Sequence, residues 1–307
     1  MRQDDDASFK EIPVLSKQLK NKIEKIDQYL ARSIDEEPQL LFLSKIFIMA
    51  NLPHKKLEPG QIWIKRNGHF TLHLSGGERV VDDAIVNLGI PYGSYARLLL
   101  IWITTQAITQ KSRVIKLKES LSKFMKELGI QPTGGVNGTI GGIKEQLIRL
   151  CSCKITIESD DYEHEMLGTQ FFLIEDKNVK WMQSKEKAAL FARESEIVLS
   201  EKFYDYITNK SVPFDFRVIS AIKQSSLTLD IYLWMTYRTF ALKKPIFVSW
   251  PQLHDQMGSQ YANVNNFRDK FLKSLKEIQL IYPDLKTERE KGGLILYPSI
   301  PHIKAAA

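Results

Sequence analysis

The chain has 307 residues, 43% of them hydrophobic, which is enough for ordinary packed cores in two domains or in one large one. It has no run of eighteen apolar residues, and its polar, acidic start is unlike a signal peptide, so we expect a cytoplasmic protein without a membrane span. Two cysteines, Cys151 and Cys153, are too few for a disulfide framework or a zinc site, and we expect two buried thiols.

The basic residues are unevenly distributed. The net charge of the whole chain is +7, and residues 213–307 alone carry 13 basic against 8 acidic side chains, a net of +5. Residues 1–50 carry 8 basic and 9 acidic side chains. A basic C-terminal part fits a nucleic-acid partner, although charge alone does not define one.

The N-terminal region predicts a helix followed by a hairpin. An amphipathic pattern with mixed charge covers 12–34, and apolar and polar residues alternate over 61–75 around Asn67-Gly68, a strong hairpin signal. His69 and His73 have the i, i+4 spacing of metal ligands on a helix, but here they fall on a strand and lack a third ligand. We therefore expect no metal site.

Residues 93–200 predict six elements in a fixed order. We expect helices over 94–110, 119–129 and 139–150 and strands over 114–117, 154–158 and 169–175. Gly129 is a suitable stop for the second of these helices. The order helix, strand, helix, helix, strand, strand is typical of a winged helix-turn-helix.

The same order recurs over 213–300. The pattern predicts helices over 213–226 and 227–242, a strand over 246–249, helices over 250–258 and 263–278, and strands over 280–285 and 293–298. Ser249 and Gln252 form an S-x-x-Q capping box, with Pro251 in the first helical turn. The expected fold class is α+β, with two tandem winged-helix domains behind an N-terminal helical and hairpin extension.

The domain boundaries follow from this pattern. We expect a helical extension over 1–50 and a β-hairpin segment over 51–92. A first winged-helix domain over 93–212 would serve dimerisation, DNA contact or both, and a second over 213–307 would be the main DNA-binding domain.

Several long, ordered blocks resemble the RepA-type plasmid replication initiators, a tandem winged-helix family. They are PYGSYARLLLIWITTQA, SLSKFMKELGIQPTGG, LDIYLWMTYR and NFRDKFLKSLKEI, and the resemblance extends over roughly residues 45 to 300. It implies a protein that binds repeated DNA sites at a plasmid origin, promotes origin opening and represses its own promoter as a dimer. The implied partners are double-stranded origin DNA, the host replication initiator and replicative helicase, and a second copy of the chain, with monomers on DNA also compatible.

The helix over 263–278 predicts the principal DNA-reading face. Placed at about 100° per residue, its large apolar side chains share one side. The opposite side is polar, and it supplies the candidate DNA-binding residues Asn265, Asn266, Lys270, Lys273 and Lys276. Asparagine can pair with adenine, and lysine can reach guanine or phosphate. The alternative is the solvated polar face that every surface helix has.

Two further regions supply candidates. The second wing offers Lys286, Arg289 and Lys291, although neighbouring acidic residues dilute its field. The loop and third helix of the first domain offer Asn137, Thr139, Lys144, Gln146 and Arg149, of which we expect Gln146 and Arg149 to be exposed. The acidic tip of the first wing, residues 159–168, would repel phosphate and is expected to face solvent or a protein.

The glycine-rich stretch 132–147 does not match a nucleotide-binding loop. A P-loop requires G-x-x-x-x-G-K-[ST], but Gly142 is followed by Ile143, and no Ser or Thr follows Lys144. The remaining interpretation of this stretch is a flexible turn that leads into a helix near Thr139. It would meet a DNA phosphate or a second subunit, or touch nothing.

Two other functions compete with an initiator. A DNA-nicking enzyme would need a metal site, but none of the six histidines forms a His-x-His pair, so we expect no catalysis and no cofactor. A winged-helix transcriptional repressor without an initiator role is the stronger alternative, because the same DNA-binding units would serve it.

Overall fold

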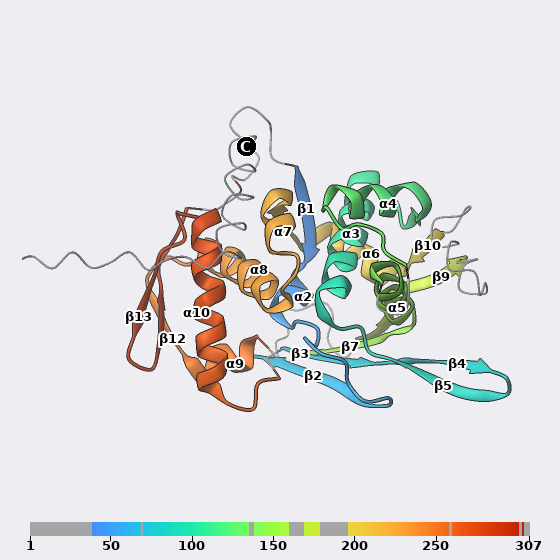
Figure 1. Ribbon diagram of the computed structural model, residues 1–307, viewed down its shortest axis with the longest axis horizontal. Coiled ribbons are helices and arrows are strands. Elements are labelled where there is room, and N and C mark those ends of the chain that lie inside the picture. The colour runs from blue at the N-terminus through green and yellow to red at the C-terminus, as the bar shows by residue number, and fades with distance from the viewer. Residues whose placement is uncertain are drawn as a thin grey trace, which may run out of the picture. The chain divides into compact units, whose positions relative to one another are not determined.

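The computed structural model describes residues 39–68, 70–134, 138–159, 169–178, 196–257, 260–300 and 303. The chain divides between Glu37 and Pro38, and residues 38–307 form one compact unit. The helix expected over 12–34 lies outside the described residues. Within them the fold is a mixture of nine helices and several small sheets, in agreement with the predicted α+β class (Figure 1).

The first described strand pairs with a segment far along the chain. Strand β1 (Leu40–Ser44) precedes α2 (Lys45–Met49) and runs antiparallel to β11 (Ser211–Asp215). The helix expected from residue 213 is therefore wrong in its first part, because these residues pair as a strand. Helix α7 (Phe216–Ile222) follows, and the Asp215 carboxylate caps it by accepting the Arg217 backbone N–H at 2.8 Å.

A four-stranded antiparallel sheet contains the predicted hairpin. Strands β2 (Ile62–Asn67) and β3 (Phe70–Ser75) pair over their whole length, which confirms the Asn67-Gly68 turn. The sheet continues through β7 (Lys154–Ser159) to β8 (Thr169–Phe172) in the order β2-β3-β7-β8. Directly after β3, β4 (Gly77–Val81) and β5 (Ala84–Gly89) form a separate two-stranded ribbon.

The helices of residues 93–212 lie close to their predicted positions. The bounds are α3 (Gly93–Gln110), α4 (Lys118–Glu127), α5 (Thr139–Ser152) and α6 (Glu201–Asn209). Gly129 follows α4 with φ +66°, a backbone conformation that suits glycine, and so it ends the helix as predicted. Strand β6 (Val114–Lys116) pairs with β10 (Glu196–Leu199), which pairs with β9 (Ile174–Asn178). Strand β6 thus belongs to a different sheet from β7 and β8.

Residues 213–300 form a more regular arrangement. After α7 come α8 (Ser226–Ala241), β12 (Ile246–Ser249), α9 (Trp250–Gln256), α10 (Val264–Ile281), β13 (Thr287–Glu290) and β14 (Gly293–Leu296). The three strands form one sheet in the order β12-β14-β13. The strand expected over 280–285 is wrong, because α10 continues to Ile281 and a turn follows. The following strand begins only at Thr287.

A buried ion pair joins the two long central helices. Arg97 of α3 and Asp230 of α8 are 3% and 5% exposed, and the guanidinium donates to both carboxylate oxygens at 2.6 and 2.7 Å. Arg97 also donates to the backbone carbonyls of Leu52, Pro53 and Gly93. Every part of this buried cation therefore has an acceptor, and α3, α8 and the 52–53 segment are held together at one point.

Candidate nucleic-acid interface

Helix α10 presents one apolar and one polar side. It starts after Asn263, whose side-chain oxygen accepts the Asn265 backbone N–H at 2.7 Å. The apolar residues expected to pack inward are all at most 4% exposed: Phe267, Phe271, Leu275 and Ile278. This confirms the predicted orientation of the helix, and the opposite side is left to solvent.

The buried side of α10 is fixed by α8 and α9. The Phe271 ring meets Trp250 of α9 edge-on at 5.8 Å, and Phe267 meets His254 at 5.1 Å. On the other flank, the Ser274 hydroxyl lies 2.9 Å from that of Thr228 in α8. Helix α9 begins with the predicted capping box, in which Ser249 and Gln252 bond reciprocally. The exposed side of α10 is therefore presented from a packed scaffold.

The solvent side of α10 carries a cationic stripe. Lys270, Lys273 and Lys276 are all exposed, and their spacing of three residues places them next to one another along the helix. Asn265 and Asn266 are exposed in the first turn. The acidic Asp269 lies among them, but its Oδ1 is 3.2 Å from Nη2 of Arg268, so this carboxylate is partly neutralised. Arg268 is a neighbouring cation that the periodicity argument missed.

The hairpin after α10 adds three basic side chains. Lys286, Arg289 and Lys291 are exposed, with Lys291 in the turn between β13 and β14. Gly292 completes that turn with φ +87°, a conformation that favours glycine. Glu288 accepts a hydrogen bond at 2.6 Å from the hydroxyl of Tyr297, and this bond raises the pKa of the Tyr297 phenol.

Two candidates from the first segment are buried, so their expected exposure is wrong. Gln146 is 3% exposed, and its Oε1 accepts the Tyr92 backbone N–H at 2.8 Å, just before α3 begins. Arg149 is 6% exposed and donates to the Ile90 carbonyl at 3.1 Å and to Glu145 at 2.8 Å. Both side chains fix the 90–92 segment onto α5, and they do not form an outward surface.

The other candidates of the first segment lie around the start of α5. Thr139 and Thr133 bond reciprocally, each backbone N–H reaching the other's hydroxyl at 2.9 and 3.0 Å. Gly138 caps the helix, and a Cβ there would lie 2.3 Å from the Thr133 carbonyl oxygen, so the position requires glycine. Lys144 is half-buried, and burial lowers the pKa of its ammonium. Asn137 lies outside the described residues.

Helix α5 is also close to α3. A Cβ on Gly142 would lie 3.0 Å from the Tyr95 ring, so this glycine permits the two helices to approach. The two cysteines near the end of α5, Cys151 and Cys153, are buried as predicted, and burial raises the pKa of the Cys153 thiol to about 12. The acidic wing tip expected over 159–168 falls outside the described residues except at Ser159.

No cluster of three or more His, Cys, Asp or Glu side chains suited to a metal occurs in the described part of the chain. Over the same residues, no helix is long and apolar enough to cross a membrane. His73 lies 3.4 Å from Glu158 on the neighbouring strand. His69 lies outside the described residues.

The described residues thus form an α+β fold, and its C-terminal part carries an exposed cationic helix followed by a basic hairpin. The family of plasmid encoded RepA proteins matches residues 90–252, slightly more than half of the chain. The chain belongs to this family and is therefore a plasmid replication protein, as the sequence blocks indicated. No curated protein matches it. The matched region runs from the start of α3 into α9, so α10 and the hairpin after it lie beyond the match.

Proposed function

We propose that this protein is a plasmid replication initiator that binds repeated double-stranded DNA sites at its origin. In this proposal it opens the origin, recruits the host initiator and replicative helicase, represses its own promoter, and performs no covalent chemistry. The observation that carries the proposal is the stripe of Lys270, Lys273 and Lys276 on a rigidly packed helix beside a basic hairpin. Family membership supports the link to replication.

The topology of residues 226–296 supports a winged-helix reading of this part. Its elements follow in the order helix, strand, helix, helix, strand, strand, and the first strand pairs with the last in the sheet β12-β14-β13. In such a unit the third helix enters the major groove and the hairpin lies along the backbone. The first segment has a related order, but β6 pairs with β10, away from β7 and β8. We therefore assign the main DNA contact to the second unit.

The chemistry of α10 suits a major groove. Asn265 and Asn266 lie at the end of the helix that would enter first, where a side-chain amide can pair bidentately with adenine. The three lysines lie further along, where they can reach guanine or phosphate. Lys286, Arg289 and Lys291 would hold the backbone beside the groove, since phosphate contacts need charge more than geometry.

A footprinting and gel-shift experiment on DNA flanking the gene tests this proposal. The wild-type chain should protect a set of repeated sites. Replacing Lys270, Lys273 and Lys276 together with Ala should abolish that protection, because three phosphate or base contacts are lost. A matched triple variant at exposed lysines elsewhere, Lys55, Lys56 and Lys202, should bind as the wild type does. Equal binding by both triple variants would show that α10 is not the DNA-reading helix.

Plasmid maintenance separates the initiator from the repressor. The gene supplied in trans should sustain a plasmid that carries only the candidate origin repeats. If the protein silences its promoter but cannot sustain that plasmid, the repressor alternative is correct. A nicking assay on supercoiled origin DNA with magnesium or manganese tests the absence of chemistry, and a cleaved, protein-linked strand would contradict it.

A further inference from the structure

The end of helix α9 is contacted by a segment from much earlier in the chain. The Met257 carbonyl, directly after α9, accepts one hydrogen bond from the Asn51 side-chain amide and another, at 2.9 Å, from Nε2 of His54. Slightly further on, the Gln260 side chain accepts the Lys55 backbone N–H at 2.7 Å. Asn51 and Met257 are both buried, so water does not compete for the bonds between them.

Strand β2 and the end of α2 extend this contact. The Met49 carbonyl accepts the side-chain amides of Asn67 and Gln256, each at 2.9 Å. The side chain of Lys65 in β2 is buried, and its Nζ lies 3.8 Å from Oδ1 of Asp255 in α9. Figure 1 shows α9 beside the β2–β3 hairpin, in agreement with these distances.

The contacts between residues 49–67 and residues 255–260, which we call the clasp, are anchored to the buried ion pair. The Asn51 amide that bonds to the Met257 carbonyl also donates to the Asp230 carboxylate at 2.7 Å. That carboxylate is the partner of Arg97. A buried charge pair resists displacement, because separating it leaves each charge without a partner. The clasp therefore ties the end of α9 to α3, α8 and the β2–β3 hairpin together.

The end of α9 in turn supports the start of α10. Nε2 of His254 lies 2.9 Å from the Tyr261 carbonyl, and the Phe267 ring contacts the rings of both residues, at 5.1 and 6.3 Å. Further along α10, the Ser274 hydroxyl bonds to Thr228 of α8 instead. The two ends of α10 thus have different supports, and the first end depends on α9.

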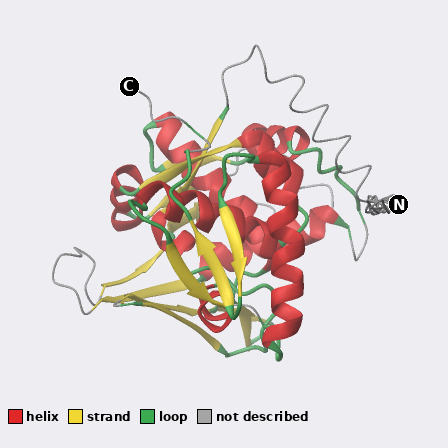
Figure 2. Cartoon of the chain, turned by 90° about the vertical axis from the view of Figure 1, so that its left-hand side faces the viewer, coloured by secondary structure: helices red, strands yellow, loops and turns green. Residues whose placement is uncertain are grey.

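The end supported by α9 is the one that would read bases. Asn265 and Asn266 are exposed in the first turn of α10. This turn and the turn between β13 and β14 lie at the same end of residues 226–296 (Figures 1 and 2). A side chain that reads a base edge must be held within about 0.5 Å of its productive position, whereas a long lysine reaches phosphate from many positions. A shift of this end would therefore cost discrimination more than affinity.

We propose that the clasp positions the base-reading end of α10, so that Asn51, His54 and Gln256 act as positioning residues for sequence discrimination without touching DNA. The inference rests on the proposed function, because it takes α10 as the helix that enters the major groove. When the clasp is loosened, the lysines of α10 remain exposed, but the amides of Asn265 and Asn266 lose their alignment with the bases.

Gel-shift titrations of the full chain against a footprinted repeat and a scrambled duplex of equal length test the proposal. Gln256→Ala combined with Gln260→Ala removes two clasp hydrogen bonds and leaves no charge unpaired. The ratio of the two affinities should fall about tenfold, the size of one lost base contact, while affinity for the scrambled duplex stays within about twofold. An unchanged ratio would overturn the proposal.

The control for this variant is Gln106→Ala combined with Gln279→Ala. Both glutamines are half-buried, as Gln256 and Gln260 are. Their side chains bond within α3 and at the far end of α10, outside the clasp. This control should keep the wild-type ratio, and a fall equal to that of the clasp variant would mean that any lost amide contact lowers discrimination.

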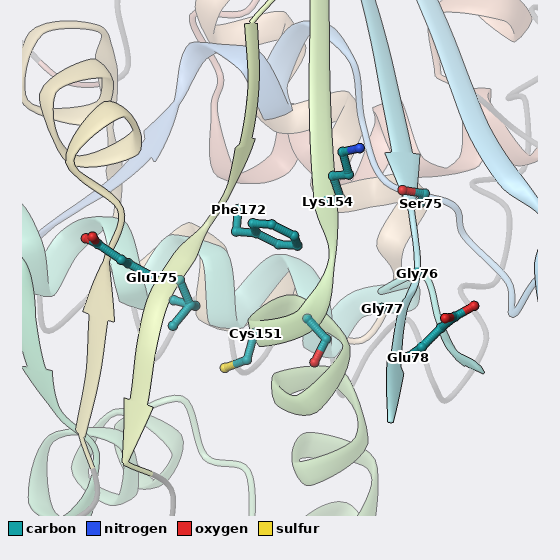
Figure 3. Close-up of a pocket in the computed structure, with 10 residues that line it drawn as sticks. Ser75, Gly76, Gly77, Glu78, Cys151, Lys154, Phe172 and Glu175 are labelled. Carbon is teal, nitrogen blue, oxygen red and sulfur yellow. The ribbon is translucent and has the colours of Figure 1, made fainter. Parts of the chain in front are cut away.

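The opposite end of the four-stranded sheet supplies a second matched pair. Ser75, Lys154 and Phe172 line a hollow of about 550 Å³ there (Figure 3), and this lining shares no described residue with the clasp. Lys65→Met and Lys154→Met each remove one positive charge from this sheet, so the long-range attraction to DNA changes similarly in both. Only Lys65→Met should lower the ratio, and an equal effect of both would contradict the assignment of β2 to the clasp.

Hydrogen exchange of the free protein separates this inference from the proposed function, because it needs no DNA. In the Gln256 and Gln260 double variant, the backbone N–H groups of Asn265 and Phe267, which bond to Asn263, should exchange several-fold faster. Those of residues 274–278 should keep their rates, and uniformly faster exchange along α10 would overturn the proposal. If the wild type does not prefer the repeat, the proposed function fails and the exchange pattern alone decides on the clasp.

Discussion

Asn266 and Lys273 occupy the same exposed side of α10, but they should act on DNA in different ways. An amide that reads a base edge contributes discrimination, so Asn266→Ala should relax the preference at one base pair by about 1–3 kcal/mol and leave the salt dependence unchanged. Lys273→Ala, if it removes a phosphate contact, should weaken binding to all sequences and reduce the salt slope by about one. Gel-shift titrations against single-base variants of the site, at several salt concentrations, separate the two effects.

His54 introduces a pH dependence of stability. Its ring lies 2.9 Å from both the Ser226 hydroxyl and the Met257 carbonyl and 3.6 Å from Asp230. Burial, and then the nearby Arg97 guanidinium, lower its pKa from 6.5 to about 4. Between about pH 4 and pH 6.5, His54 binds a proton in the unfolded chain but not in the folded chain. The stability contributed by neutral His54 is therefore complete above pH 6.5 and is lost as the pH falls towards 4.

Denaturant unfolding at pH 7 and pH 5 measures this contribution. From pH 7 to pH 5, the free energy of unfolding should fall by about 2 kcal/mol more in the wild type than in the His54→Gln variant. The reason is that Gln keeps polar contacts but does not titrate. The carboxylates that titrate in both proteins cancel in the comparison. Equal losses in the two proteins would mean that His54 keeps an ordinary pKa in the folded state.

Arg149 and Lys273 show how well helical periodicity predicts the exposure of single side chains. Both are cations on the side of a helix that the pattern assigns to solvent, and the assignment is right only for Lys273. Arg149 is buried because the 90–92 segment, distant in sequence, crosses over α5 and offers a carbonyl acceptor. The pattern describes a helix by itself, and it contains no information about which distant segment will cover it.

At the scale of elements, the buried Arg97 should contribute far more to the free energy of unfolding than an exposed arginine such as Arg113. Replacing Arg97 with Met leaves Asp230 buried without its cation, which should cost about 3–5 kcal/mol of the free energy of unfolding. Arg113 is a matched control, since its pair with Glu175 at 3.0 Å joins side chains that are 37% and 56% exposed. Arg113→Met should cost about 0–1 kcal/mol. Similar losses in both variants would contradict the role of the buried pair in joining α3 to α8.

The elements themselves were more predictable than their pairing. The capping box at Ser249, the stop at Gly129 and the Asn67-Gly68 turn are local signals, and the structure confirms each of them. The pairing of β6 with β10, and that of β1 with β11, join strands separated by long stretches of sequence, and no local signal specifies them. The strand expected over 280–285 does not form because α10 continues to Ile281, which completes its buried side, and Tyr282 and Leu285 are buried in the turn that follows.

At the scale of the whole molecule, the salt dependence of DNA binding should report how many copies engage the site. Each copy presents six exposed cations that we assign to DNA, on α10 and on the hairpin after it: Lys270, Lys273, Lys276, Lys286, Arg289 and Lys291. If all six displace counterions, the slope of log K against log salt should be about −5 for one copy and about −11 for a dimer that engages two sites. A slope near zero for the wild type would mean that this cationic surface does not meet phosphate.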